Sequence, residues 1–298
     1  MSEYRNLEIL GVGKEPGGRF GKVLIAGSGK IVGDVECEEF SIPGSGKVED
    51  GSLTVHGPIS CYGAGKVEGS VRAESLSVYG AFSAEGECEI QGDAEVTGSF
   101  KNEGPCSVGG SAKITGTWKT EGEFRGQQVR VSGVLKSEAS IRAEEITVTG
   151  VLKADGDVQA ERFTAEGPVT IEGELNAEQV ELRLSGESQI GSIVGARVQV
   201  RRSGSGSGSG SDSDRVRIHL DLNLPFFGKR RIDYDGKSRS CLICQLIEAD
   251  EIWLENTDAE TVRGVNVHIG SECVVDRVEY SGSLTTAADA SVGEKIKI

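Results

Sequence analysis

Apolar and polar residues alternate in short triplets along most of the chain. Between Val23 and Leu182 the triplets read apolar–polar–apolar, and Gly or polar residues separate them. Typical examples are Leu76-Ser77-Val78, Ile146-Thr147-Val148 and Val169-Thr170-Ile171. Alternation with a period of two is the pattern of a β-strand, and each triplet is too short to be a helix. The pattern therefore predicts many short strands.

The triplets repeat at steps of about 17–19 residues, which arranges them in three columns. The first column is Val23, Phe40, Ile59, Leu76, Ala94, Ala112, Val129, Ile146, Phe163 and Val180. The second is Gly29, Gly46, Gly65, Phe82, Phe100, Trp118, Leu135, Leu152 and Val169. The third is Val35, Leu53, Val71, Cys88, Cys106, Phe124, Ile141, Val158 and Leu175. Where the second column has Gly, the apolar residue lies two positions later, on the same strand face, at Ile31, Val48 and Val67.

This repeat predicts an all-β fold, a β-solenoid with three short strands per coil around a triangular cross-section. One coil cannot bury its inner face alone, so coils stack at roughly 4.8 Å and align like residues into ladders. We expect about ten coils in a rod of roughly 45–50 Å. Gly residues are expected at the corners, where the backbone needs positive φ and close approach.

The composition fits a narrow core and argues against nucleic acid as a partner. The 298 residues include 43 Gly but only 8 Phe and 5 Tyr, too few for the core of an ordinary sandwich. The net charge of −15 argues against nucleic-acid binding, which depends on Lys and Arg neutralising phosphates. No secretory signal precedes the seven Cys, and no apolar run approaches the length of a membrane-spanning helix. We therefore expect a cytoplasmic protein with reduced thiols.

Four segments are expected along the chain. Residues 1–22 are predicted to be a flexible leader and residues 23–200 the main β-helix. Residues 201–240 contain a Ser/Gly linker and then a strictly alternating stretch, Arg215 to Leu224, expected to form an amphipathic hairpin or loop. Residues 241–298 are predicted to be a second, shorter β-helical block of about three coils. Its coils of about 19 residues are inferred from the pairs Val265/Leu284 and Cys273/Val292. Whether this block continues the first rod or docks beside it stays open.

The triplets at about 17–18 residues per coil, without helices or catalytic insertions, resemble the bactofilins, bacterial polymer-forming cytoskeletal proteins. The resemblance covers residues 23–200, and the segment from Leu246 to Ile298 looks like the tail of Gram-positive members. It implies a right-handed triangular β-helix and non-polar filaments that form without nucleotide, joined end to end and often at a membrane. Most members have one short β-helix, whereas this chain has a longer rod and a second block.

Both ends of the expected rod present strand edges with no capping helix. We therefore expect the partner to be a second copy, with a homopolymer interface at Val23, Ile25, Val35, Val292, Ile296 and Ile298. Introducing Asp at Val23 and Ile25 is predicted to stop growth and leave the fold intact. An alternative remains open, in which leader residues Leu7, Ile9, Leu10 and Val12 cover the first coil and close that end.

A short cluster of two aromatic and three basic residues follows the alternating stretch. Aromatic side chains insert at lipid interfaces while cations meet anionic head groups, so this cluster is a hypothetical membrane contact. A solvated hairpin tip is the alternative. The cluster consists of Phe226, Phe227, Lys229, Arg230 and Arg231.

The sequence contains no convincing catalytic or metal-binding pattern. Gly27-Ser28-Gly29-Lys30 and its two repeats lack the spacing and the following Ser/Thr of a phosphate-binding loop, so they indicate corners. Cys241 and Cys244 have the spacing of half a zinc site, with only Cys273 and His268 as further ligands. His56 is expected to be solvated, and steps of five break the register of hexapeptide acyltransferases.

We therefore expect a non-enzymatic scaffold without cofactor or small-molecule substrate that self-assembles end to end. A monomeric or small-oligomer adaptor that holds a protein or a membrane is the alternative, and an acyltransferase-like enzyme ranks last.

Overall fold

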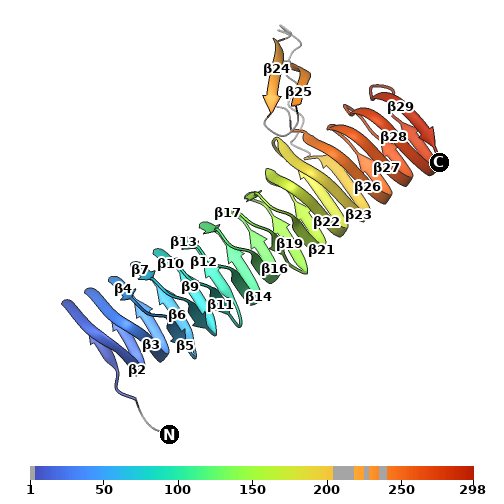
Figure 1. The fold of residues 1–298 in the computed structure, drawn as a ribbon. Helices are drawn as coiled ribbons and strands as arrows, with labels where there is room; N and C mark the ends of the chain where they lie inside the picture. Colours follow the sequence, from blue (N-terminus) through green and yellow to red (C-terminus); the bar gives the residue numbers. More distant parts are fainter. Residues whose placement is uncertain (1–3, 204–217, 225–227, 235–239) are drawn as a thin grey trace.

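The computed structural model describes residues 4–203, 218–224, 228–234 and 240–298, with backbone only for the two short ranges. These residues form a parallel β-solenoid of about 15 coils, with the two termini at opposite ends of the rod (Figure 1). Twenty-seven strands belong to one continuous sheet, and every regular element in the described part of the chain is a strand. At roughly 4.8 Å per coil the rod is about 70 Å long, because coils formed by residues 7–22 and 240–298 extend the ten or so that were expected over residues 23–200.

The strands of the N-terminal half are mostly short because the chain soon turns a corner. They are β1 (Leu7–Ile9), β2 (Val12–Ile25), β3 (Ser28–Ile42), β4 (Ser45–Glu49), β5 (Leu53–Val55), β6 (Pro58–Cys61), β7 (Ala64–Val67), β8 (Val71–Ala73), β9 (Ser75–Val78), β10 (Ala81–Ala84), β11 (Cys88–Ile90), β12 (Ala94–Val96), β13 (Ser99–Asn102), β14 (Cys106–Ile114) and β15 (Thr117–Thr120).

The second half contains several strands that continue around a corner. They are β16 (Phe124–Val131), β17 (Val134–Ser137), β18 (Ile141–Arg142), β19 (Glu145–Val148), β20 (Val151–Ala154), β21 (Val158–Ala165), β22 (Val169–Leu184), β23 (Ser188–Arg202), β26 (Leu242–Leu254), β27 (Thr257–Ile269), β28 (Val274–Thr286) and β29 (Ser291–Lys297). A separate antiparallel pair, β24 (Ile218–Leu224) and β25 (Gly228–Tyr234), projects from the rod (Figure 1).

The strand registers confirm all three predicted columns. In the first, Ala94 pairs with Leu76 on one side and Ala112 on the other. In the third, Cys88 pairs with Cys106. The two-residue shift in the glycine rows is also confirmed, because Ile31 pairs with Val48 and both are buried. Each row therefore places like residues above one another, and the buried apolar side chains form one core cluster along the rod.

The rod begins earlier than the sequence indicated. Residues 7–22, expected to belong to a flexible leader, form β1 and the first part of β2. Leu7 pairs with Val23 and Ile9 with Ile25. The buried apolar residues of this first coil are Leu7, Ile9 and Phe20, which are 7%, 5% and 3% exposed. Of the four residues in the alternative, Leu7 and Ile9 do cover the coil of Val23, whereas Leu10 and Val12 are 69% and 95% exposed.

The second block continues the first rod, because β26 pairs in parallel with β23 along their length, with Val198 beside Ile252. The predicted coil length there was wrong. Leu242 pairs with Thr257, a step of 15, and Val275 pairs with Val292, a step of 17. Val265 instead lies at a register shift between Gly264 and Asn266, and it is 39% exposed.

The interior of the middle coils contains a ladder of aromatic rings and a short polar network. Phe82, Phe100 and Trp118 stack in adjacent coils with centroid distances of 5.6 and 4.9 Å. Asn102 replaces the usual apolar residue of its row and is fully buried. Its Oδ1 accepts a hydrogen bond from Trp118 Nε1 at 2.9 Å, and its Nδ2 donates to Thr120 Oγ1 at 2.8 Å. The buried amide therefore has partners on both sides.

Close approach, rather than positive φ, explains most of the corner glycines. In the described residues only Gly18 and Gly33 have positive φ among the glycines. At Gly63 a Cβ atom would overlap the carbonyl oxygen of Gly44 in the preceding coil. The expectation of positive φ at the corners was therefore wrong, and the packing of one coil on the next requires Gly there instead.

Candidate functional sites: the ends and outer faces of the rod

The N-terminal end is a strand edge whose apolar side chains are mostly covered. The guanidinium of Arg5 lies over the ring of Phe20, 5.6 Å from its centroid. The backbone N–H of Gly21 donates to the carbonyl oxygen of Arg5 at 3.0 Å, which holds residues 4–6 against the second coil. Leu10 and Val12, on the outside of the same coil, are 69% and 95% exposed. Among the described residues, the outer edge of β1 and of the first part of β2 has no partner strand, and exposed apolar residues surround it.

The residues expected at the N-terminal interface lie one coil inside the rod. Val23, Ile25 and Val35 are at most 1% exposed. An Asp at Val23 or Ile25 would therefore be buried in the core and would disrupt the fold, contrary to the expectation from sequence. Leu7, Ile9 and Phe20 occupy the end in their place.

The C-terminal end consists of β29 and the last part of β28. Val292 is half-buried against the core together with Leu284 and Ala290. Ile296 aligns with Glu279, which is only 8% exposed and forms an ion pair with Arg263, and Ile298 is 67% exposed. Within the described residues β29 pairs only with β28, so its other edge is open. The three residues expected from sequence at this end do lie at it.

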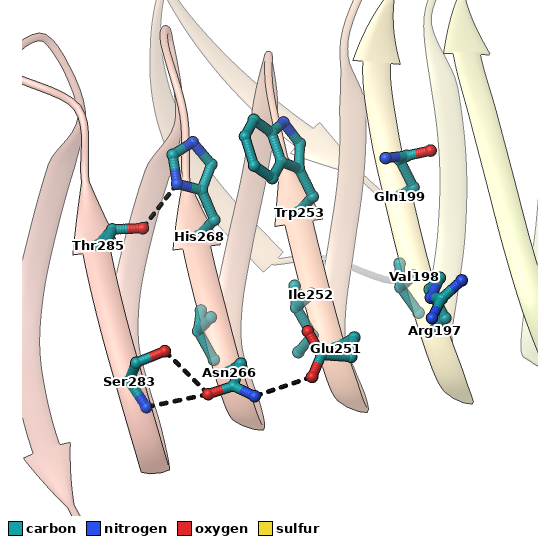
Figure 2. A pocket seen from close by; sticks show the side chains of 11 residues that line it. Arg197, Val198, Gln199, Glu251, Ile252, Trp253, Asn266, His268, Ser283 and Thr285 are labelled. Carbon is teal, nitrogen blue, oxygen red and sulfur yellow. Dashed lines mark hydrogen bonds between the residues drawn. The ribbon is translucent and has the colours of Figure 1, made fainter.

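A shallow groove of about 440 Å³ crosses the C-terminal coils on the face whose strands continue the first column, at Val198, Ile252 and Val267 (Figure 2). The ring of Trp253, 40% exposed, stacks on the ring of His268 with centroids 3.7 Å apart. His268 Nδ1 lies 2.6 Å from the hydroxyl of Thr285. A second row of hydrogen bonds, from Asn266 to Glu251 and from Ser283 to Asn266, lines the other side of the groove. The groove therefore combines an aromatic surface with fixed polar groups.

A double ladder of lysines and carboxylates runs along the face formed by the strands of the second column, here called the second face. The lysines occupy the same outward position in successive coils, except that Ser83 lies there between Lys66 and Lys101. Most of them have a carboxylate two residues later, and they are Lys30, Lys47, Lys66, Lys101, Lys119, Lys136 and Lys153. Lys47 Nζ contacts Glu49 at 3.0 Å, and Lys119 contacts Glu138 at 2.9 Å. Hydrogen bonds from Lys30 and Lys47 lower the pKa of Glu49 to about 2. The ladder neutralises stacked like charges along the rod.

Sequence reasoning missed this ladder, although its signal was available. The repeat Lys-x-Glu, as in Lys47-Val48-Glu49 and Lys119-Thr120-Glu121, recurs at the coil period. Because successive coils stack in register, such a repeat places each carboxylate between two lysines. A search for charge patterns at the coil period would have identified it.

The thiols are mostly core residues. Cys88 and Cys106 are buried neighbours in one column, as predicted, and the Cys88 side chain together with burial raises the pKa of Cys106. Burial also raises the pKa of other thiols, to about 12 for Cys37 and Cys244 and about 11 for Cys61 and Cys273. Within the ranges that the structure covers, no group of three His, Cys, Asp or Glu could hold a metal ion.

The remaining sequence candidates lie at corners or outside the described residues. The three Gly-Ser/Ala-Gly-Lys repeats stack in adjacent coils, with their second glycine at an inner strand position. Their first glycines, Gly27, Gly44 and Gly63, lie at the bends that precede these strands, so the repeats begin at corners. His56 is solvated, and its Nε2 lies 3.2 Å from Glu36. Of the proposed membrane cluster, Phe226 and Phe227 lie outside the described residues. Lys229, Arg230 and Arg231 lie in β25, described by its backbone alone. The described residues include no helix that could span a membrane.

These features define a parallel β-solenoid rod with open strand edges at both ends. Residues 18–89 match the family model of the bactofilins, described as polymer-forming cytoskeletal proteins. That match confirms, for this stretch, the resemblance that the repeat pattern indicated.

Two curated relatives from Bacillus subtilis (strain 168) match a limited part of the chain. The uncharacterized protein YhbE is 49% identical over 57 residues, which are 19% of this chain and 24% of the relative. The uncharacterized protein YhbF is 36% identical over 70 residues, which are 24% of this chain and 30% of the relative. The chain thus matches less than a third of the length of either relative. No solved structure matches it significantly.

Proposed function

We propose that this protein is a cytoskeletal scaffold that assembles end to end into filaments without nucleotide. The observation that carries the proposal is the in-register parallel sheet with an open strand edge at each end. An unpaired edge is a template for another strand, and proteins either cover such edges or use them. The match of residues 18–89 to a polymer-forming family supports the second alternative.

The strand edges and the rim residues would supply the contact. Because Leu7, Ile9 and Phe20 are already nearly buried, stacking a second copy on this end removes little further apolar area from them. The exposed Val12 at one end and Ile298 at the other offer additional apolar contact. Growth is therefore expected to depend on backbone hydrogen bonds and on these rim residues.

Substitutions in one outward column give a matched test of end-to-end growth. Val12 and Val134 both belong to the outward column of the second face, Val12 in the first coil and Val134 in the middle of the rod. We expect V12D to raise the protein concentration needed for sedimentable polymer, whereas V134D leaves it unchanged. Equal effects of V12D and V134D would place the contact on the side of the rod. Absence of polymer from the wild-type protein at any concentration or salt would contradict the proposal.

The groove of Trp253 and His268 favours the second candidate function, an adaptor that holds a partner on a flat face. Uniform short rods with no growth would favour this function over the filament. In that case, W253A is the first variant to compare with wild type in binding experiments.

Membrane association remains a prediction from sequence. Removing both rings in the double variant F226A/F227A is expected to reduce sedimentation of the protein with vesicles containing anionic lipid. Equal sedimentation of the variant and the wild-type protein would contradict it.

A further inference from the structure

One corner of the triangular cross-section carries no charged residue along the first nine coils. The corner is a triplet with a central Gly in every coil, from Leu10-Gly11-Val12 in the first to Thr149-Gly150-Val151 in the ninth. The eighteen residues that flank these glycines are all exposed, and none is Asp, Glu, Lys or Arg. Charged residues are mostly exposed, and they make up 27% of the chain, so about five would be expected among these eighteen. We call this surface the uncharged edge.

The uncharged edge also carries most of the exposed large apolar side chains of the described residues. Six of the eleven lie on it, namely Leu10, Val12, Tyr62, Tyr79, Val134 and Val151. In the middle of the edge, the rings of Tyr62 and Tyr79 stack with centroids 4.9 Å apart and an interplanar angle of 6°. Exposed apolar residues that gather in one strip mark a contact surface, and Tyr is enriched in such surfaces.

The other two corners of these coils are acidic. One carries Glu85-Gly86-Glu87 and Glu121-Gly122-Glu123, and the other carries Glu144 and Glu145. Because the net charge is −15, two rods that approach each other through these corners are repelled. Tyr79 and Glu85 are separated by one side of the triangle, roughly 20 Å for six residues, well beyond the screening length of about 8 Å at physiological ionic strength. Contact through the uncharged edge therefore keeps the acidic corners of two copies apart.

We propose that two copies of this protein associate side by side along the uncharged edge. A second copy fits this edge because it offers the same straight strip with the same coil spacing of roughly 4.8 Å, and a two-fold axis brings the two strips together. An edge without charge offers nothing to a partner that is selected by charge complementarity. The contact is lateral, so it goes beyond the proposed end-to-end assembly and does not depend on it.

The contact between two single rods is expected to be weak. Nine coils make the edge about 40 Å long, so at a width of about 10 Å it buries on the order of 400 Å² per copy, about half of what a stable interface buries. A single carboxylate on the edge, as in V134D, therefore changes the threshold for filament growth little. In filaments many such contacts act together, so filaments pair although single rods rarely do.

Cross-linking tests the side contact on rods that have not grown into filaments. Thr97, in the middle of the uncharged edge, and Gln91, at an acidic corner of the same coil, are both exposed. With a short bis-maleimide, T97C should give several times the yield of covalent dimer that Q91C gives. The wild-type protein, with its half-buried Cys241, supplies the background. Equal dimer yields from T97C and Q91C would overturn the proposal.

A charge placed on the uncharged edge tests its role in filaments. In electron microscopy we expect T97E to form single filaments under conditions where wild type and the matched variant Q91E form paired ones. Added salt should strengthen the pairing, because it screens the repulsion between acidic corners. Wild-type filaments that stay single at every salt concentration, or pairing that survives T97E, would overturn the side contact alone. Protein that gives T97C cross-links but no filaments would contradict the proposed function and leave the side contact standing.

Discussion

Replacing Asn102 by Leu is expected to loosen the middle of the rod, since the side chains are similar in size but only Asn accepts a hydrogen bond. The variant leaves Trp118 Nε1, now 2.9 Å from Asn102 Oδ1, without an acceptor in a fully buried site. An unsatisfied buried donor costs about 1–3 kcal/mol. The hydroxyl of Thr120 keeps its bond to the carbonyl of Gly122 at 3.0 Å, so it adds little to this cost.

Hydrogen–deuterium exchange of the strands around Asn102 measures this effect locally. A loss of about 1–3 kcal/mol corresponds to exchange roughly 5- to 150-fold faster in β13 and β15, since each ~1.4 kcal/mol is a factor of ten. A local readout is preferable because repeat proteins do not always unfold in one step. The neighbouring outward variant K101A, which removes only exposed ion pairs, should change protection by less than about 1 kcal/mol.

A double-mutant cycle with W118F decides whether loss of the hydrogen bond from Trp118 Nε1 to Asn102 Oδ1 causes the faster exchange of N102L. Phe lacks the ring N–H, so N102L should cost less in the W118F background than in the wild-type protein, with a coupling of about 1 kcal/mol or more. Equal costs of N102L in the two backgrounds, or unchanged exchange in N102L alone, would refute the reasoning.

Three further predictions concern the corners, the charge ladder and the thiols. G63V should lower stability by at least about 3 kcal/mol, because its Cβ would overlap the backbone of the preceding coil, whereas G11V, which has open space around its Cβ, should cost much less in thermal unfolding. Lys30 and its neighbour lower the pKa of Glu49 from 4.5 to about 2, so the stability that this carboxylate contributes is present above pH 4.5 and is lost as the pH falls toward 2. Unfolding temperatures of wild type and E49Q should therefore converge in acid, and a constant difference between them would contradict the assignment. Among the thiols, the half-buried Cys241 should react first with a thiol reagent in the folded protein at neutral pH, and rapid modification of several others would show that the core is open.

The sequence predicts the rod well where the coil length is constant. Because coils stack in register, residues one coil length apart in the sequence lie beside each other in adjacent coils. The sequence therefore predicts the pairs Phe100/Trp118 and Val129/Ile146 correctly. The glycine rows were also predictable, because a shift by two positions keeps the side chain on the same strand face.

The prediction failed where a coil departs from this pattern. In the first coil Glu15 and Gly18 occupy inner positions, so the apolar triplets there are not recognisable and the coil was interpreted as a leader. The last coils are shorter than the sequence indicated, which displaced the predicted neighbour of Cys273 by two positions. The partners of a buried polar residue such as Asn102 depend on side-chain directions that the repeat period does not specify.

For the candidate functional sites, too, the sequence located some features and missed others. Val292 and Ile296 lie in β29, the last strand of the rod, as their strand pattern indicated, and their role in a polymer contact stays a prediction. The groove at Trp253 and His268 was missed, since the stacking of these rings requires the shortened coil step that the sequence did not reveal.

Negative-stain electron microscopy of the purified protein without nucleotide, across concentration and salt, tests the central claim most directly. End-to-end assembly predicts filaments that lengthen with concentration and keep the width of a single rod or a simple multiple of it. Uniform rods of about 70 Å at every concentration, from about 15 coils at roughly 4.8 Å, would mean that the ends do not join, and would contradict the account.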